Sequence, residues 1–392
     1  MTTKKLLKGI VVGLIFLTVG IVACAPRSAP APSVPTPAAA ASVSGPASNL
    51  QPIRQAQGMP LTSQDAAWAK VVEAGKKEGL LIVYSFSMIG DTGTKVSKAF
   101  FDKYGISVDI ISGRGAEFLE RVKTERRNGQ VMASVIDSSS THLINMKKAG
   151  LLEGASDLPA LRDKTVWSVD PLIYGADAHV IGARVQTYYS WVNTRVVPSG
   201  QEPGSYRDLL QPRWKGKLGV GDPRLSEGSY ATFVTLLRRG LISVETVREL
   251  GQQNLQYYTG SNDGFRALIK GEIAAALGYT EINASGFIRE GAPVKAVALE
   301  EGSVVQLSSA ALIKEGPKPN AARLFLNWLI SQDGQSLYIK ETGVASVRND
   351  VPEFRPPAAV AQNKKLVVMT EADADESASK FADKYLAQLW QR

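Results

Sequence analysis

The chain has few residues of the kinds that carry metal or redox chemistry. Among its 392 residues are one cysteine, Cys24, and two histidines, His142 and His179. A single cysteine excludes a disulfide framework within the chain and a multi-cysteine zinc or iron–sulfur site. The P-loop, HExxH, GxSxG and CxxC patterns are also absent. We therefore expect no cofactor and no enzymatic activity.

The chain also lacks long runs of one charge. Its net charge is +8, yet no block of Lys or Arg is longer than a pair. Because nucleic-acid binding needs clustered cations to neutralise phosphates, we expect no nucleic-acid partner. With 44% hydrophobic residues, 35 Gly and 20 Pro, the composition is that of a globular protein. The length exceeds what one core usually supports and favours two domains.

The first residues form a targeting signal rather than part of the fold. Lys4, Lys5 and Lys8 precede an apolar run over 10–22. This run is shorter than the ~20 residues of a membrane-spanning helix. The pattern predicts a lipoprotein signal peptide over 1–23, with Cys24 lipidated after cleavage. The alternative is an ordinary signal peptide or a membrane helix that contains a cysteine by chance.

The segment 24–60 is predicted to be a tether rich in Pro, Ala and Ser. It has seven prolines between residues 25 and 52, and no acidic or aromatic residue there. Such a composition buries too little apolar surface to offset the entropy of ordering the chain. We expect an exported protein held by its lipid at the outer face of the cytoplasmic membrane or in the periplasm.

From about residue 64, apolar runs alternate with amphipathic stretches. Strands are predicted at 80–84, 106–111, 135–136, 189–193, 218–220, 274–278, 294–299 and 304–312. Helices are predicted around 96–104, 118–122, 143–150, 230–237 and 320–329, the last with Asn320 as N-cap, and a final helix over 381–389. This alternation favours an α/β fold with a largely parallel sheet and helices on both faces.

Small polar residues recur where an apolar strand ends and a helix begins. Unpaired N–H groups at helix N-termini attract anions and polar ligands, and strand carboxyl ends line the ligand crevice of open α/β sheets. We therefore predict that these clusters form one ligand-binding crevice. A single cluster of this kind is more often only a helix cap. The predicted ligand-binding residues are Ser85, Ser87, Arg114, Ser138, Ser139, Ser140, Ser226, Gly228, Ser229 and Tyr279.

Four segments form a recognisable pattern: WVNT at 191–194, SYRDLLQPRWKGK at 205–217, DPR at 222–224, and NAARLFLNWLISQDGQ at 320–335. Together they resemble the extracellular solute-binding proteins of ABC importers, and most closely the ferric-iron-type branch. The resemblance covers most of 64–350. It implies a type II periplasmic-binding-protein-like fold: α/β, with two lobes of mixed sheets flanked by helices, joined by two crossover hinge strands. The implied organisation is lobe 1 over 61–178, lobe 2 over 179–300, and a return to lobe 1 with C-terminal helices over 301–392.

The chain departs from this branch at the expected metal position. Ferric members hold the ion with phenolate oxygens, typically from two adjacent tyrosines at the place of Tyr279-Thr280. Here Tyr279 stands alone, followed by Thr280 and Glu281. The pairs Tyr188-Tyr189 and Tyr257-Tyr258 lie elsewhere in the pattern, and the first is interpreted as core packing of a hinge strand. We predict no metal site, with Tyr279 as the ligand if iron is bound.

Arg114 is the candidate for charge recognition. It follows a strand between two glycines, and its planar guanidinium suits a carboxylate or phosphate. The alternative is a surface arginine paired with Glu117. The expected function is capture of a small, anionic organic solute by a lipid-anchored monomer that hands it to an ABC importer permease. The alternatives are a ferric-iron-binding protein, a sensory ligand-binding protein, or a secreted enzyme on the same fold.

Overall fold

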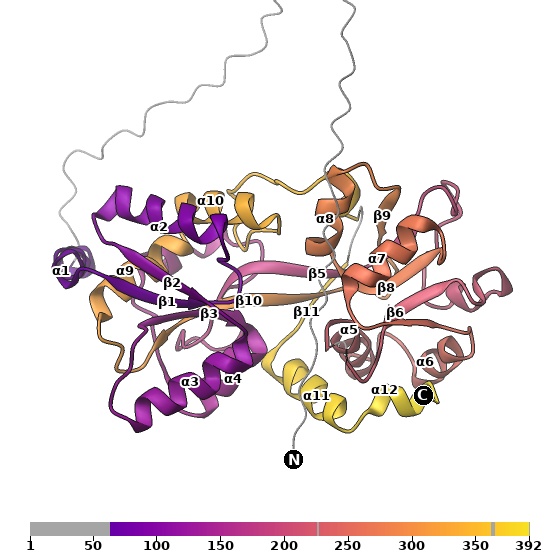
Figure 1. Cartoon of the computed structure of the whole chain (residues 1–392), viewed down its shortest axis with the longest axis horizontal. Coiled ribbons are helices and arrows are strands. Elements are labelled where there is room, and N and C mark those ends of the chain that lie inside the picture. The colour runs from indigo at the N-terminus through magenta and orange to yellow at the C-terminus, as the bar shows by residue number, and fades with distance from the viewer. Residues whose placement is uncertain (1–62, 226, 362–364, 392) are drawn as a thin grey trace, which may run out of the picture. The chain divides into compact units, whose positions relative to one another are not determined.

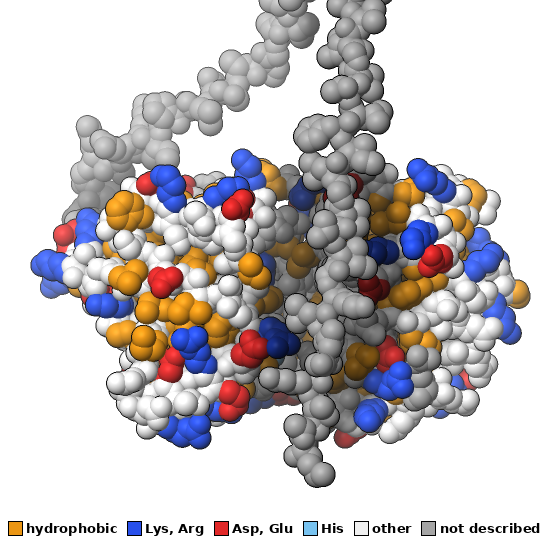
Figure 2. All heavy atoms as spheres, in the orientation of Figure 1, with side chains coloured by type: hydrophobic (Ala, Val, Ile, Leu, Met, Phe, Trp, Pro, Cys, Tyr) orange, Lys and Arg blue, Asp and Glu red, His pale blue; other side chains and the backbone are white. Residues whose placement is uncertain are grey.

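A computed structural model describes residues 63–225, 227–361 and 365–391 (Figure 1). The predicted signal peptide, Cys24, the tether and Ser226 lie outside these residues. Within the described part, no helix combines the length and apolar character needed to cross a membrane. On the face in Figure 2, basic, acidic and hydrophobic side chains are interspersed.

The first strand group consists of three parallel strands, each followed by a helix. The strands are β1 (Leu81–Ser85), β2 (Val108–Ser112) and β3 (Val135–Ser139). The helices are α2 (Asp91–Tyr104), α3 (Gly115–Arg127) and α4 (Ser140–Lys148), preceded by α1 (Ser63–Glu78) and followed by β4 (Leu152–Glu153). The predicted strand–helix alternation is confirmed here.

The second strand group repeats this arrangement. Its parallel strands are β6 (Leu218–Gly221), β7 (Gln256–Tyr258) and β8 (Ala275–Thr280). Its helices are α5 (Glu227–Arg238), α6 (Val244–Gly251), α7 (Ser261–Lys270) and α8 (Glu281–Arg289). The strand β7 was not predicted.

Two long strands join the groups into one mixed sheet. These are β5 (Ile181–Asn193) and β10 (Ser303–Ile313), which pair antiparallel and cross the middle of Figure 1. The strand order is β2-β1-β3-β10-β5-β8-β6-β7, and β9 (Val294–Val297) pairs with β5. Nearly every residue of both long strands is buried, as expected for apolar strands covered on both faces. The structure confirms an α/β fold with a mixed sheet.

The helices after β10 correct two predictions. Helix α9 (Pro319–Leu329) begins at Pro319 with Lys318 as N-cap; Asn320 is not the cap, and its backbone N–H instead donates to the Glu78 carboxylate. The predicted helix over 381–389 is two helices, α11 (Glu371–Ala382) and α12 (Tyr385–Leu389). Lys384 breaks the run because its φ of 54° is left-handed.

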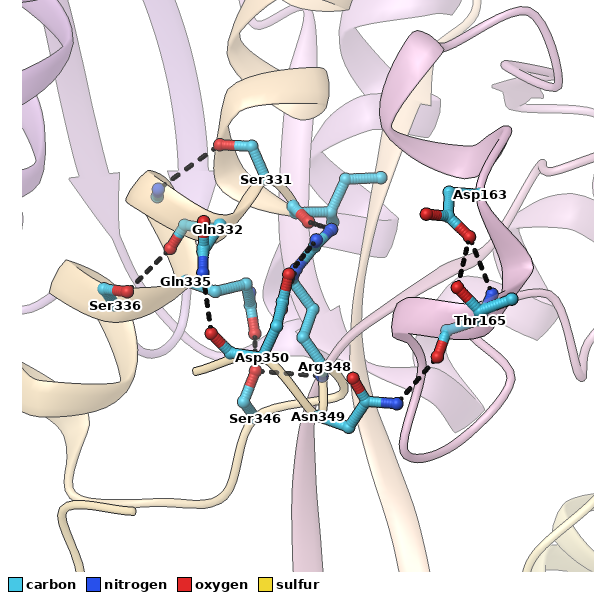
Figure 3. A network of polar contacts seen from close by, with 12 residues as sticks. Asp163, Thr165, Ser331, Gln332, Gln335, Ser336, Ser346, Arg348, Asn349 and Asp350 are labelled. Carbon is cyan, nitrogen blue, oxygen red and sulfur yellow. Dashed lines mark hydrogen bonds and ion pairs between the residues drawn. The ribbon is translucent and has the colours of Figure 1, made fainter. Parts of the chain in front are cut away.

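Polar contacts tie the segment after α10 (Gln332–Thr342) back to that helix and to the residues around Thr165 (Figure 3). The Ser346 hydroxyl donates to Gln335 Oε1 at 2.7 Å, and Gln335 Nε2 donates to the Ala183 carbonyl at 2.7 Å. Arg348 makes a two-pronged ion pair with Asp350, with N–O distances of 2.8 and 2.7 Å. These contacts hold the segment that follows α10 in place.

This segment continues to the second strand group. Arg355 Nη1 donates to Glu281 of α8 at 3.4 Å, and Glu281 also accepts the backbone N–H of Thr187 at 2.7 Å. After β11 (Leu366–Val368), which pairs with β10, helix α11 packs on α5. The buried Asp373 carboxylate bonds Arg238 at 2.7 Å and Arg239 at 2.6 Å. The C-terminal helices are thus bound firmly to α5 and α6.

Candidate functional site

A cavity of about 900 Å³ lies where the two strand groups face each other. The end of β2 with the start of α3, the end of β3 with the start of α4, and the first turns of α5 reach it, and the strands β5 and β10 supply its floor. It is lined by Phe86, Ile89, Ser112–Ala116, Ser138, Ser139, Thr141, His142, Asn145, Gln186, Tyr188, Gly228, Ala231, Gln306, Met369, Ala374, Ser377, Ala378 and Phe381. This is the crevice position expected for a ligand in an α/β sheet.

The N-termini of α3 and α4 meet at the polar end of the cavity. They can approach because Gly115 has no side chain. A Cβ at this position would lie 2.4 Å from both Ser138 Oγ and His142 Nδ1. The first turns of two helices therefore border the same space, and the partial positive charge of helix N-termini favours an anion there.

Ser138 adds a hydroxyl to this end. Its side chain is fully buried, and the hydroxyl has no hydrogen-bond partner among the described residues. An unpartnered buried hydroxyl is costly, so a bound polar group would relieve that cost. Ser139 is occupied in a different way, since its hydroxyl lies 2.7 Å from His142 Nδ1.

A chain of hydrogen bonds crosses the floor. The Tyr188 hydroxyl donates to Gln306 Oε1 at 3.0 Å, and Gln306 Nε2 donates to Thr141 Oγ1 at 3.2 Å. Gly228 leaves room for the tyrosine ring, because a Cβ there would lie 2.9 Å from Tyr188 Cε1. This chain links β5, β10 and α4.

Tyr188 is a lining residue that the sequence interpretation placed in the core. Successive side chains of a strand point to opposite faces, so adjacent tyrosines cannot share one environment. Tyr189 is buried on the other side, where burial, followed by the nearby Glu281 carboxylate, raises its pKa to about 12. The alternation of side chains along a strand therefore predicts that only one of Tyr188 and Tyr189 lies in the core.

Another wall of the cavity is mostly apolar. Helix α11 supplies Ala374, Ala378 and Phe381 together with Ser377, Met369 lies two residues before this helix, and the loop after β1 supplies Phe86. The Phe381 ring is half-buried and packs edge-on against Tyr230 of α5, with centroids 5.0 Å apart. The sequence pattern predicts only an amphipathic helix here. Its place in the cavity depends on tertiary packing.

Four of the predicted residues line the cavity: Arg114, Ser138, Ser139 and Gly228. The Arg114 side chain is 87% exposed and pairs with Glu117, its Nε donating to Oε1 at 2.8 Å. Hydrogen bonds from the Arg114 backbone N–H and then its side chain lower the pKa of Glu117. Arg114 thus stands at the rim and takes part in the surface pair considered as its alternative.

Four other serines make structural contacts and do not line the cavity. Ser85 donates to Asp137 at 2.6 Å, and Ser87 bonds the same carboxylate. Ser140 bonds the Leu307 carbonyl and lies 2.7 Å from Ser309 Oγ. Ser229 donates to the Gly278 carbonyl of β8 at 3.1 Å.

Tyr279 also lies away from the cavity. Its side chain is 0% exposed and packs against Phe265, with ring centroids 5.5 Å apart. Burial raises the pKa of its hydroxyl, which has no hydrogen-bond partner among the described residues. In the same part of the chain, no three His, Cys, Asp or Glu side chains are grouped to hold a metal ion.

The chain is similar to proteins of one known family. Residues 81–343 match the family model of the bacterial extracellular solute-binding proteins. Iron uptake protein A2 of Synechocystis sp. is 27% identical over 275 residues, covering 65% of this chain and 75% of that protein. Iron-bound HitA from Pseudomonas aeruginosa has a TM-score of 0.63 at 23% identity, covering 78% and 99%. AfuA from Actinobacillus pleuropneumoniae, with fructose-6-phosphate bound, has a TM-score of 0.59 at 20% identity, covering 79% and 97%. The fold is that of the two-lobed type II periplasmic binding proteins.

Proposed function

The chain belongs to the bacterial extracellular solute-binding proteins, and from this premise we propose that it captures a small organic anion for an ABC importer. The family is one of binding proteins rather than enzymes, found outside the cytoplasm, with a small-molecule ligand and a transporter permease as partners. The class of solute is inferred from the residues that line the cavity.

The observation that carries the proposal is the polar end of the cavity. Two helix N-termini converge there around Ser138, whose buried hydroxyl has no partner among the described residues. Arg114 at the rim would add long-range attraction, although its exposure and its pair with Glu117 reduce its contribution. The apolar side chains of α11 and Phe86 would contact the organic part of the solute.

Native mass spectrometry of the freshly purified mature protein tests this function directly. We expect a bound mass consistent with an organic acid or phosphate ester. A thermal-shift screen should then show stabilisation by that compound. At about 100 times its dissociation constant, a ligand adds roughly 2.7 kcal/mol to the free energy of unfolding. Stabilisation by neutral compounds only would contradict the anionic solute.

Ferric iron is the second candidate, because two similar proteins are described in terms of iron. One is called an iron uptake protein and another is described as iron-bound. The described lining of the cavity contains one tyrosine, Tyr188, and Tyr279 is buried elsewhere. Iron held by several phenolates gives visible charge-transfer absorption. We expect no strong band on adding ferric citrate; a band lost in Tyr188→Phe or Tyr279→Phe would favour iron.

A further inference from the structure

Arg184 continues the floor of the cavity along β5. It precedes the lining residues Gln186 and Tyr188 by two and four positions, so the three side chains share one face of the strand. Across the sheet, Arg184 pairs in register with Ser308 of β10, which pairs with the lining residue Ser139 of β3. Arg184 therefore lies one step beyond the described lining.

The guanidinium of Arg184 is nearly buried between two aromatic rings. The residue is 4% exposed, and its guanidinium carbon lies 4.7 Å from the ring centroid of Phe86 and 5.5 Å from that of Tyr338. The two aromatic rings contact the flat faces of the guanidinium through cation–π stacking. The N–H groups point outward in the guanidinium plane and need hydrogen-bond acceptors of their own. Phe86 itself lines the cavity.

These N–H groups have no anionic partner within the described residues. Its Nε and the neighbouring Ser308 Oγ are both buried without hydrogen-bond partners among the described residues. The nearby Asp137 carboxylate is already bonded by Ser85, Ser87 and Tyr338.

The other well-buried arginines contrast with this. Arg355, with a side chain 3% exposed, pairs with Glu353 and Glu281. Arg348 pairs with Asp350. A buried charge is strongly unfavourable unless it is paired and hydrogen-bonded. An unpaired guanidinium beside a ligand cavity thus points to a partner that is not among the described residues.

We propose that Arg184, together with the Ser308 hydroxyl, binds the anionic group of the captured solute. The group would be a carboxylate or a phosphate, whose oxygens match the planar edge of a guanidinium. It would enter alongside the Phe86 ring, from the space lined by Ser139 and Gln186. This inference rests on the proposed capture of an anion and adds the residue that recognises its charge.

The test compares anion binding in four proteins: wild type, Arg184→Gln, Ser308→Ala and Arg126→Gln. Arg126 is a surface arginine of α3 that pairs with Glu315, outside the cavity lining, and serves as the charge-matched control. The probes are inorganic phosphate, citrate and benzoate, each against chloride at equal ionic strength. Melting temperature and calorimetric affinity are measured.

We expect at least one of these anions to stabilise the wild type. Arg184→Gln should weaken its binding about tenfold to a hundredfold, since a hydrogen bond to a charged group is lost. Ser308→Ala should weaken it less, and Arg126→Gln should bind as the wild type does. Arg184→Lys should recover part of the loss, because an ammonium keeps the charge but not the planar fork.

The melting temperature in chloride provides a readout independent of binding. Without an anion, Arg184→Gln should be at least as stable as the wild type, because it removes an unpaired buried charge. Equal anion affinity in the wild type and Arg184→Gln overturns the inference, as does a wild type that none of the three anions stabilises. If the protein still binds a neutral solute or iron, capture itself stands and only the anion-recognising role is lost.

Discussion

Replacing Tyr279 with phenylalanine should make the protein more stable. The hydroxyl is buried and unpartnered among the described residues, and mutational data put the cost of burying such a group at about 1–3 kcal/mol. Tyr279→Phe keeps the ring and its packing against Phe265. Part of the gain is lost because the oxygen leaves a small gap beside Gly264, where a Cβ would lie 2.3 Å from that oxygen. We expect a net gain of about 1 kcal/mol in the free energy of unfolding.

The matched control is Tyr189→Phe. Tyr189 pairs in register with Tyr279 and is 1% exposed, but its hydroxyl interacts with Thr187 and Arg355. Removing those hydrogen bonds should cost about 1 kcal/mol. Both variants delete one tyrosine hydroxyl, from adjacent strands. Tyr279→Phe should raise the free energy of unfolding and Tyr189→Phe should lower it, so the two variants should differ by about 2 kcal/mol.

Urea denaturation followed by tryptophan fluorescence measures both changes. With m near 3 kcal/mol/M, a change of 1 kcal/mol moves the midpoint by about 0.3 M. Solute affinity should be the same in Tyr279→Phe and the wild type, because Tyr279 lies outside the cavity lining. A loss of stability of 1 kcal/mol or more in Tyr279→Phe, or a loss of binding, would refute the reasoning and return Tyr279 to the site.

Three further changes have defined outcomes. Gly115→Ala should cost about 1–3 kcal/mol of stability and weaken solute binding, because its Cβ overlaps Ser138 and His142; Gly286→Ala, a helix glycine with open space around it, should be neutral or stabilising in the same urea titration. Asp373→Asn should cost about 1.5–3 kcal/mol at pH 7. Burial opposes ionisation of Asp373, but hydrogen bonds from Arg239 and Thr370 prevail and lower its pKa, so its stabilisation is present above about pH 4 and is lost as pH falls through the folded-state pKa. Stability curves from pH 7 to 3 that superimpose for Asp373→Asn and the wild type would contradict this. Cys24→Ala should release the protein from membranes in soluble form, and a variant that still sediments with membranes after a salt wash would refute lipid anchoring at this residue.

The strands were predictable where the chain is apolar on both faces. Runs such as 80–84 and 304–312 carry this signal and correspond to β1 and β10. The strand β7 was not predicted because it has only three residues and begins with the polar Gln256, so it forms no apolar run. The break between α11 and α12 was not predicted because the apolar periodicity of the sequence continues through it. The left-handed φ of Lys384 has no counterpart in the sequence pattern.

The candidate site was harder to predict than the fold. Small polar residues at strand ends do surround the cavity, but the same residue types also serve as internal partners, as Ser85 does for Asp137. Only three-dimensional structure separates the two uses. Arg184 gives no local signal either, since its neighbours Phe86 and Ser308 are about a hundred residues away on either side. Whether an arginine is paired depends on long-range packing.

The order in which the ribosome makes the chain has a consequence for when the cavity exists. Strand β10 inserts between β3 and β5 although both are synthesised more than a hundred residues earlier. The sheet therefore stays divided until residue 313 has emerged. Helix α11 comes later still, and with it Phe381 and the apolar wall. A nascent chain could form the helix N-termini around Ser138 but not an enclosed pocket, so binding begins only when synthesis is nearly finished, and a protein truncated before α11 would lack one side of its site.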